Sequence, residues 1–251
     1  MKVTFIGAGP GDPDLLTVKA RRLIENCRCL IYAGSLVSDE VVALAPVNAE
    51  LHNSAEMSLE QMVDVYKRAK EIDMDVARLH TGDPSLYGAI LEQMNELDAL
   101  GIEYDVVPGV SSFQAAAAAL KIELTVPEKS QAVIIARNGG RTPVPASQEL
   151  EQLAKSGATL CIFLSVQAID EVAQKLAPHY GPQAPTAAVY RASWPDQKIV
   201  TGTLADIAEK IKQAGIGNMT MIIVGPALER AQTASKLYDP SFTHAFRTAI
   251  R

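Results

Sequence analysis

The sequence has 251 residues, of which 48% are apolar and 21% are charged, and its formal net charge is -6. A chain of this length and composition can bury a core as one large domain or two small ones, which argues against the disordered and fibrous classes. The acidic balance argues against nucleic acid as a partner, whereas a few arginines suffice to bind an anionic small molecule.

The first half of the chain alternates short apolar runs with longer segments of helical period. This pattern is typical of βα units built around a parallel sheet. It predicts strands at 3–6, 29–32, 75–80 and 104–107, and helices at 15–25, 59–71 and 86–100. An alanine-rich stretch at 114–120 follows Pro108 and Gly109 and closes this half.

The second half begins a new α/β pattern. It predicts strands at 131–136, 159–164, 187–190, 198–200 and 221–224, and helices at 148–155, 168–177 and 204–214. Only a turn separates the strands 187–190 and 198–200, so we expect them to pair antiparallel. The sequence therefore predicts two α/β subdomains, 1–113 and 114–230, with a mixed sheet in the second and a tail at 231–251.

The chain shows no feature of export, membrane insertion or metal binding. No basic and apolar leader precedes the first strand, and no apolar run reaches the roughly 18 to 20 residues of a membrane-spanning helix. Cys27, Cys29 and Cys161 lack a C-x-x-C spacing, and the four histidines are isolated, so we expect reduced thiols and no metal site. These features predict a cytoplasmic protein without a membrane partner.

Three loops follow predicted strands, where open α/β sheets bind their ligands. The first, 7–13, opens with G-x-G, but Asp12 stands where a dinucleotide fingerprint needs its third glycine, and a plain tight turn explains the glycines equally well. The second, 81–88, contains Gly82 and Asp83, which could approach a ligand or cap a helix. The third, 108–112, brings small residues and hydroxyls to a helix start. Spacing alone indicates an α/β enzyme or binding protein with a cleft.

Taken together, these loops resemble the tetrapyrrole methylase family. Its pattern G-x-G-P-G-D-x-x-L-L-T-x-x-A is matched from Gly7 to Ala20, and three further motifs are matched at 82–84, 108–112 and 218–225. The resemblance covers about residues 1–230. Within the family, the stretches 32–37, 80–89, 141–145 and 237–244 are most similar to the subgroup that methylates precorrin-4 at ring carbon 11 in cobalamin biosynthesis.

The resemblance implies two α/β subdomains with an active-site cleft between them, the fold of class III methyltransferases, assembled as a homodimer. It implies S-adenosylmethionine as the methyl donor and S-adenosylhomocysteine as the product, bound without a Rossmann-type fingerprint. Phe163 and Leu164 could equally be core residues, whereas Gly82 and Asp83 are hard to explain as packing. The positions that correspond to cofactor contacts are Pro10, Thr81, Gly82, Asp83, Leu86, Ser111, Ser112, Phe163, Leu164, Ala192 and Thr220.

The substrate that the resemblance implies carries acetate and propionate groups, which the planar guanidinium of arginine binds better than lysine does. Arg137, Arg141 and Arg191 lie in or beside predicted loops and are the candidate substrate contacts, although surface arginines also occur without a ligand. No catalytic residue is predicted, because displacement at a sulfonium releases a neutral thioether and needs no general acid.

Other interpretations stay open. The acceptor could be another precorrin, uroporphyrinogen III or a protein-bound diphthamide precursor, and the sequence leaves open whether it already holds cobalt. A non-catalytic nucleotide- or flavin-binding module would use the turn from Gly7 to Pro10 for phosphate, and Asp12 disfavours that use.

Overall fold

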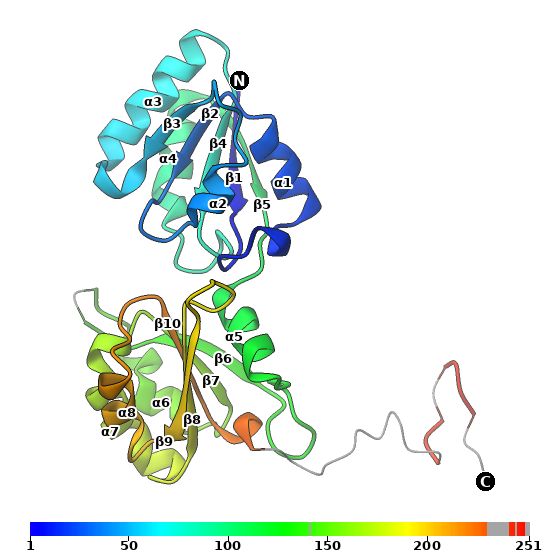
Figure 1. The fold of residues 1–251 in the computed structure, drawn as a ribbon, viewed down its shortest axis with the longest axis vertical. Coiled ribbons are helices and arrows are strands. Elements are labelled where there is room, and N and C mark those ends of the chain that lie inside the picture. The colour runs from blue at the N-terminus through cyan, green and yellow to red at the C-terminus, as the bar shows by residue number, and fades with distance from the viewer. Residues whose placement is uncertain (141, 230–240, 244, 249–251) are drawn as a thin grey trace. The chain divides into compact units, whose positions relative to one another are not determined.

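The structure is a computed structural model that describes residues 1–140, 142–229, 241–243 and 245–248 (Figure 1). It divides into two compact units: unit 1 comprises residues 1–116 and 191–197, and unit 2 comprises 117–190 and 198–251. The division falls inside α5 (Ser112–Leu120), between Ala116 and Ala117, and residues 191–197 group with unit 1. Most of the predicted tail at 231–251 lies outside the described residues.

Unit 1 is built on a five-stranded sheet with the strand order β3-β2-β4-β1-β5. Every neighbouring pair is parallel, as the alternation of strand and helix predicted. The strands are β1 (Lys2–Gly7), β2 (Cys29–Tyr32), β3 (Glu50–Asn53), β4 (Val76–His80) and β5 (Glu103–Val107). Because the strands all run the same way, the loops that follow them emerge at one edge of the sheet.

Helices cover both faces of this sheet: α1 (Val18–Glu25) and α2 (Asp39–Val42) on one, α3 (Leu59–Glu71) and α4 (Ile90–Leu100) on the other (Figure 1). Phe5 packs with Tyr66 of α3 in one buried cluster, and Leu30 packs with Ile24 of α1 in the other. All four side chains are fully buried, because side chains alternate between the two faces along each strand.

Unit 2 contains a mixed sheet with the order β6-β7-β10-β8-β9. The pair β6 and β7 is parallel, and the other three pairs are antiparallel, including the predicted antiparallel pair β8 and β9. Its strands are β6 (Val133–Arg137), β7 (Thr159–Phe163), β8 (Pro185–Tyr190), β9 (Lys198–Thr203) and β10 (Thr220–Val224), and its helices include α6 (Leu150–Ala154), α7 (Ile169–Tyr180) and α8 (Ile207–Gln213). One buried aliphatic cluster joins this sheet to its helices.

Two predicted helices of unit 1 begin later than the periodicity indicated. The helix predicted at 15–25 starts at Val18, because the Thr17 hydroxyl caps it by accepting a hydrogen bond from the Ala20 amide at 3.1 Å. The helix predicted at 86–100 starts at Ile90, because Tyr87 and Ala89 adopt left-handed backbone with φ of 56° and 48°. The loop after β4 is therefore longer than predicted.

Two short elements of unit 1 were not predicted. Edge strand β3 has the sequence Glu-Leu-His-Asn and lacks the apolar pattern of a buried strand, and α2 spans only four residues. Among the described residues, no helix is both long and apolar enough to span a membrane.

Candidate functional site

The three predicted loops of unit 1 meet at the carboxyl edge of its sheet. Strand β1 lies between β4 and β5, so the loops after these three strands are neighbours. The Ala8 amide donates to the His80 carbonyl at 2.8 Å, and Gly9 and Gly82 exchange both backbone hydrogen bonds, at 2.8 and 3.3 Å. The expectation that these loops gather in space is therefore correct for unit 1.

Three glycines allow the backbones of these loops to touch. A β-carbon at Gly7 would lie 2.5 Å from the Gly109 Cα, and one at Gly109 would lie 2.2 Å from the Gly82 carbonyl oxygen. Gly82 also has a φ of +63°, which other residues adopt rarely. Only hydrogen fits at positions 7 and 109, so the three loops pack backbone against backbone in a cluster that we call the cradle.

Asp83 joins the second loop to the third. Its Oδ2 accepts a hydrogen bond from the Gly109 amide at 2.9 Å, and its Oδ1 accepts from the amide and hydroxyl of Ser85. Burial raises the pKa of this carboxyl, but the hydrogen bonds from Ser85 and Gly109 outweigh burial and hold the pKa below its usual value. Asp83 is therefore an anion at neutral pH, and it fixes the cradle's geometry.

The other predicted residues of these loops differ in exposure. Thr81 is exposed, Leu86 is half-buried and Ser111 is buried, while Ser112 begins α5. The Ser111 amide donates to the Gln114 side chain at 2.9 Å, which caps the start of that helix. Unit 1 thus brings Pro10, Thr81, Gly82, Asp83, Leu86, Ser111 and Ser112 to one edge of its sheet.

Residues 191–197 form hydrogen bonds with the first loop. Only Arg191 and Ala192 of this segment were predicted site residues, and these contacts were not predicted from the sequence. The Trp194 indole N–H donates to the Pro10 carbonyl at 2.7 Å, and the Asp12 amide donates to the Ser193 hydroxyl at 3.1 Å. A β-carbon at Gly11 would lie 2.1 Å from the Trp194 Nε1. The glycine at position 11 is thus explained by the indole that lies against it.

A cavity of about 490 Å³ lies beside this segment. Its lining includes Asp12, Ser38, Arg191 and Trp194. The Arg191 guanidinium lies 4.0 Å from the centre of the Trp194 ring and forms an ion pair with Asp196 at 2.8 Å. Of the three candidate substrate arginines, Arg191 is the one that unit 1 places near the first loop.

Replacing Trp194 with phenylalanine is expected to lower the free energy of unfolding by about 1 kcal/mol, because the ring packing is kept while the hydrogen bond to Pro10 is lost. Trp194 is the single tryptophan of the chain, so unfolding must be followed by circular dichroism. An unfolding curve that superimposes on that of the original protein would show that the indole does not hold the loop.

Unit 2 gathers its predicted residues at one edge of its own sheet. Phe163 ends β7 and pairs in register with Arg137, which ends β6. Thr220 begins β10, which is antiparallel to β7, and therefore lies at the same edge. Leu164 follows β7 with a φ of +53° and is 77% exposed, so the alternative that it is a core residue is wrong.

Arg137 ends β6, beside the loop that follows this strand. The Arg137 guanidinium donates to the backbone carbonyls of Thr142 and Pro143, at 2.8 and 2.9 Å, and so organises this loop. Arg141 lies outside the described residues.

His80 ends β4, immediately before the second loop, and is buried beside Arg78. Burial and the neighbouring Arg78 guanidinium lower the pKa of His80 to about 3, against a smaller opposite effect of a backbone hydrogen bond with Gly88. The imidazole is therefore neutral at pH 7. In the folded protein the imidazole therefore also stays neutral in mildly acidic solution.

The free energy of unfolding is expected to fall by about 2 kcal/mol between pH 6.5 and 5 because of His80. Above pH 6.5 the imidazole is neutral in both the folded and the unfolded chain. Below pH 6.5 the unfolded chain takes up a proton, whereas the folded chain does so only near pH 3. Urea unfolding at several pH values should show this slope in the original protein and a flatter one in His80→Gln. Equal slopes would contradict the assignment.

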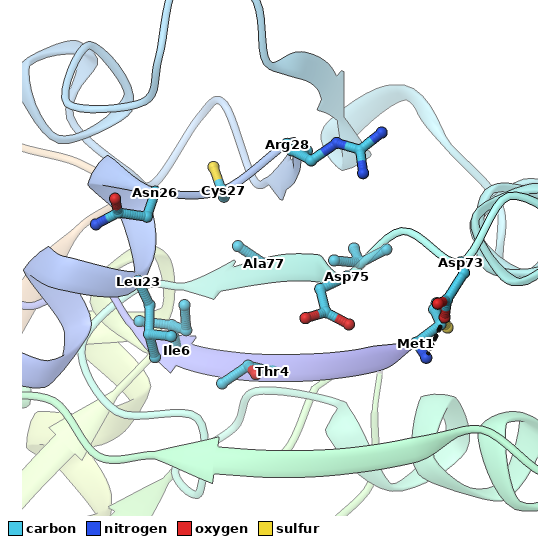
Figure 2. Close-up of a pocket in the computed structure, with 11 residues that line it drawn as sticks. Met1, Thr4, Ile6, Leu23, Asn26, Cys27, Arg28, Asp73, Asp75 and Ala77 are labelled. Atoms are coloured by element: carbon cyan, nitrogen blue, oxygen red, sulfur yellow. Dashed lines mark hydrogen bonds and ion pairs between the residues drawn. The ribbon is translucent and has the colours of Figure 1, made fainter.

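A second cavity of unit 1 lies away from these loops. It has a volume of about 450 Å³ and is lined by the start of the chain, the end of α1 and the start of β4 (Figure 2). The Met1 amino group forms an ion pair with Asp73 at 2.7 Å there. None of the predicted site residues lines this cavity.

Comparison with known proteins assigns the chain to a family. Residues 2–208 match the model of the tetrapyrrole (corrin/porphyrin) methylases. The chain is 52% identical to the cobalt-precorrin-4 C(11)-methyltransferase of Methanocaldococcus jannaschii, over 98% of this chain and 96% of that protein. It is 46% identical to the precorrin-4 C(11)-methyltransferase of Pseudomonas aeruginosa, over 98% of this chain and 99% of that protein.

Solved structures support the same family assignment. A cobalt precorrin-4 methyltransferase superimposes with a TM-score of 0.89 at 43% identity, covering 91% of this chain and 96% of that one. A uroporphyrin-III C-methyl transferase from Thermus thermophilus, complexed with S-adenyl homocysteine, gives 0.76 at 29% identity over 91% and 99%. The chain therefore belongs to the tetrapyrrole (corrin/porphyrin) methylase family, as its loop motifs predicted.

Proposed function

We propose that this protein transfers a methyl group from S-adenosylmethionine to ring carbon 11 of precorrin-4 or cobalt-precorrin-4, in the cytoplasm, as a step of cobalamin biosynthesis. The observation that carries the proposal is the near full-length identity to relatives with that name, 52% and 46%. The dinucleotide alternative loses support, because the loop that suggested it lies within residues 2–208, which match the methylase family model.

The cradle of unit 1 is the proposed place for the methyl donor. Gly7, Gly82 and Gly109 let the three loops pack backbone against backbone at one edge of the sheet, and a solved structure similar to this chain is a complex with S-adenyl homocysteine. When bound, S-adenosylmethionine supplies a methyl group whose leaving group is a neutral thioether. The residues proposed to hold it in unit 1 are Pro10, Thr81, Gly82, Asp83, Leu86, Ser111, Ser112 and Ala192, and those in unit 2 are Phe163, Leu164 and Thr220.

The protein's contribution would be alignment of the acceptor carbon with the methyl group and exclusion of water. Rigid loops suit this task. The Asp83 carboxylate accepts hydrogen bonds from amides of the second and third loops, and the Trp194 indole donates one to the first loop. These contacts form the cradle without a ligand. No general acid is needed, and no catalytic side chain is assigned.

Replacing Arg141 with alanine is expected to weaken binding of the tetrapyrrole at least about 10-fold and to leave the affinity for S-adenosylhomocysteine unchanged, since a guanidinium suits carboxylate groups. Calorimetric titrations of the same preparation with each ligand measure both. Equal loss of the two affinities would remove Arg141 from the substrate site.

We further propose that the protein is a homodimer, as the family resemblance implies. Light scattering at low protein concentration tests this, and a monomer mass would contradict it.

Mass spectrometry of products from a panel of acceptors tests the proposed function. Precorrin-4, cobalt-precorrin-4, uroporphyrinogen III and a diphthamide precursor are each incubated with S-adenosylmethionine. We expect one methyl group to be added to one or both forms of precorrin-4 and none to the others. Methylation of uroporphyrinogen III alone would overturn the proposed acceptor while leaving the methyl donor intact.

A further inference from the structure

Three side chains that commonly bind metal ions meet on one face of the sheet in unit 1. Cys29 begins β2 and pairs in register with Glu50, which begins β3. His52 lies two residues after Glu50 and therefore on the same face. The Cys29 sulfur, a carboxylate oxygen of Glu50 and a ring nitrogen of His52 all lie within 4.8 Å of one another. This cluster is at the amino ends of its strands, whereas the loops of the proposed methylase site follow the carboxyl ends.

The spacing of these atoms is close to that of a tetrahedral zinc site. Ordinary bond lengths from zinc to sulfur, nitrogen and oxygen place the ligand atoms about 3.3 to 3.7 Å apart. The His52 Nε2 is already 3.7 Å from the Glu50 Oε2. The remaining adjustment of any one pair of ligand atoms is at most about 1.5 Å. It falls on edge strand β3, where the side chains of His52 and Glu50 are 23% and 40% exposed and so leave an entry path.

The His52 imidazole is in a form that suits a cation, whereas the Cys29 thiol is not. The His52 Nε2 is buried without a hydrogen-bond partner among the described residues. Burial lowers the pKa of His52, so the imidazole is neutral at pH 7, the form that binds metal. Burial raises the pKa of the Cys29 thiol to about 11, which the nearby Arg68 guanidinium opposes only in part. A metal ion would therefore have to displace the thiol proton.

One positive charge opposes the cation. The Arg68 guanidinium of α3 forms an ion pair with the Glu50 carboxylate. A carboxylate has two oxygens and about four acceptor positions, so it can bind a metal ion and still accept from arginine. Cys29 is fully buried, and the Glu50 carboxylate also binds Arg68. The affinity for a metal ion should therefore be lower than that of a site with three dedicated ligands.

We propose that Cys29, Glu50 and His52 form a binding site for a thiophilic divalent cation of the zinc class, with water as the fourth ligand. Bound metal would tie edge strand β3 to β2 and so stabilise unit 1. The sequence predicted no metal site, because Cys29 and His52 are far apart along the chain and β3 was not predicted. The pairing of β2 with β3 brings the two residues together.

Zinc binding to the full-length, tag-free protein after treatment with a chelator tests this site. Calorimetry should give one zinc per chain, with a proton released and with an affinity that rises with pH, because the thiol must ionise. Binding of cobalt(II) should produce a near-ultraviolet thiolate charge-transfer band. Cys29→Ser should lower the zinc affinity roughly 100-fold or more and remove that band. Cys27→Ser is the matched control, because Cys27 is outside the cluster, and it should leave both unchanged.

Two further measurements keep the test decisive if Cys29→Ser does not fold. His52→Gln changes a partly exposed residue on an edge strand and should also weaken zinc binding by at least about 10-fold. The cobalt spectrum of the unaltered protein needs no variant. Zinc binding absent from the unaltered protein, a cobalt spectrum without a thiolate band, or binding that His52→Gln leaves unchanged would each overturn the proposal. Methylase activity plays no part in these readouts.

Discussion

Replacing Gly109 with alanine is expected to lower the free energy of unfolding by about 3 kcal/mol and to abolish binding of S-adenosylhomocysteine. The added methyl group would lie 2.2 Å from the Gly82 carbonyl oxygen and 2.8 Å from the Gly7 Cα. Both neighbours are backbone, so relief requires the carboxyl ends of β4, β1 and β5 to separate. Urea unfolding and calorimetry measure the two effects.

Gly140→Ala is the matched control for this prediction. Gly140 is exposed, has no positive φ, and a β-carbon there would meet no atom within 4 Å. Its effect on the free energy of unfolding should stay within about 0.5 kcal/mol. If Gly109→Ala and Gly140→Ala behave alike, the loops of unit 1 are not packed backbone against backbone.

Replacing Asp83 with asparagine is expected to lower the free energy of unfolding by about 2 kcal/mol and the affinity for S-adenosylhomocysteine by more than about 10-fold. Asp83 now accepts hydrogen bonds from Gly109 and Ser85 as an anion. An amide keeps the shape but has one acceptor oxygen, and its NH₂ group would face an N–H donor. The second and third loops would lose their link.

Asp64→Asn controls for the loss of one negative charge. Asp64 is 74% exposed, and its ion pair with Lys67 lies on the surface of α3, where such pairs contribute little. We expect Asp64→Asn to leave both measurements unchanged. An Asp83→Asn protein with normal affinity for S-adenosylhomocysteine would show that the cradle forms without this carboxylate.

Long elements with strong patterns could be predicted from the sequence. Strand β2 and helix α3 have the predicted bounds, because a buried apolar run and a Ser58 capping box mark their ends. Strand β3 could not be predicted, since a solvated edge strand needs no apolar alternation. The late start of α4 depends on left-handed backbone at Tyr87 and Ala89, which neither residue type signals.

The candidate site could be predicted only in part. Gly82 and Asp83 stood out because their sequence pattern had no packing explanation, and the structure gives them contacts across loops. Trp194 was missed, because its contact with Pro10 joins residues 184 positions apart and no local pattern reports such a pair. A tryptophan beside a proline-containing turn, with a free indole N–H to satisfy, was the available signal.

The central claim is transfer of a methyl group to ring carbon 11. Its most direct test is NMR of the product formed from precorrin-4 or cobalt-precorrin-4 and S-adenosylmethionine labelled with carbon-13 in the methyl group. We expect one enriched methyl signal, coupled to carbon 11. An enriched methyl group at another ring carbon, or no enrichment with either acceptor, would contradict the account.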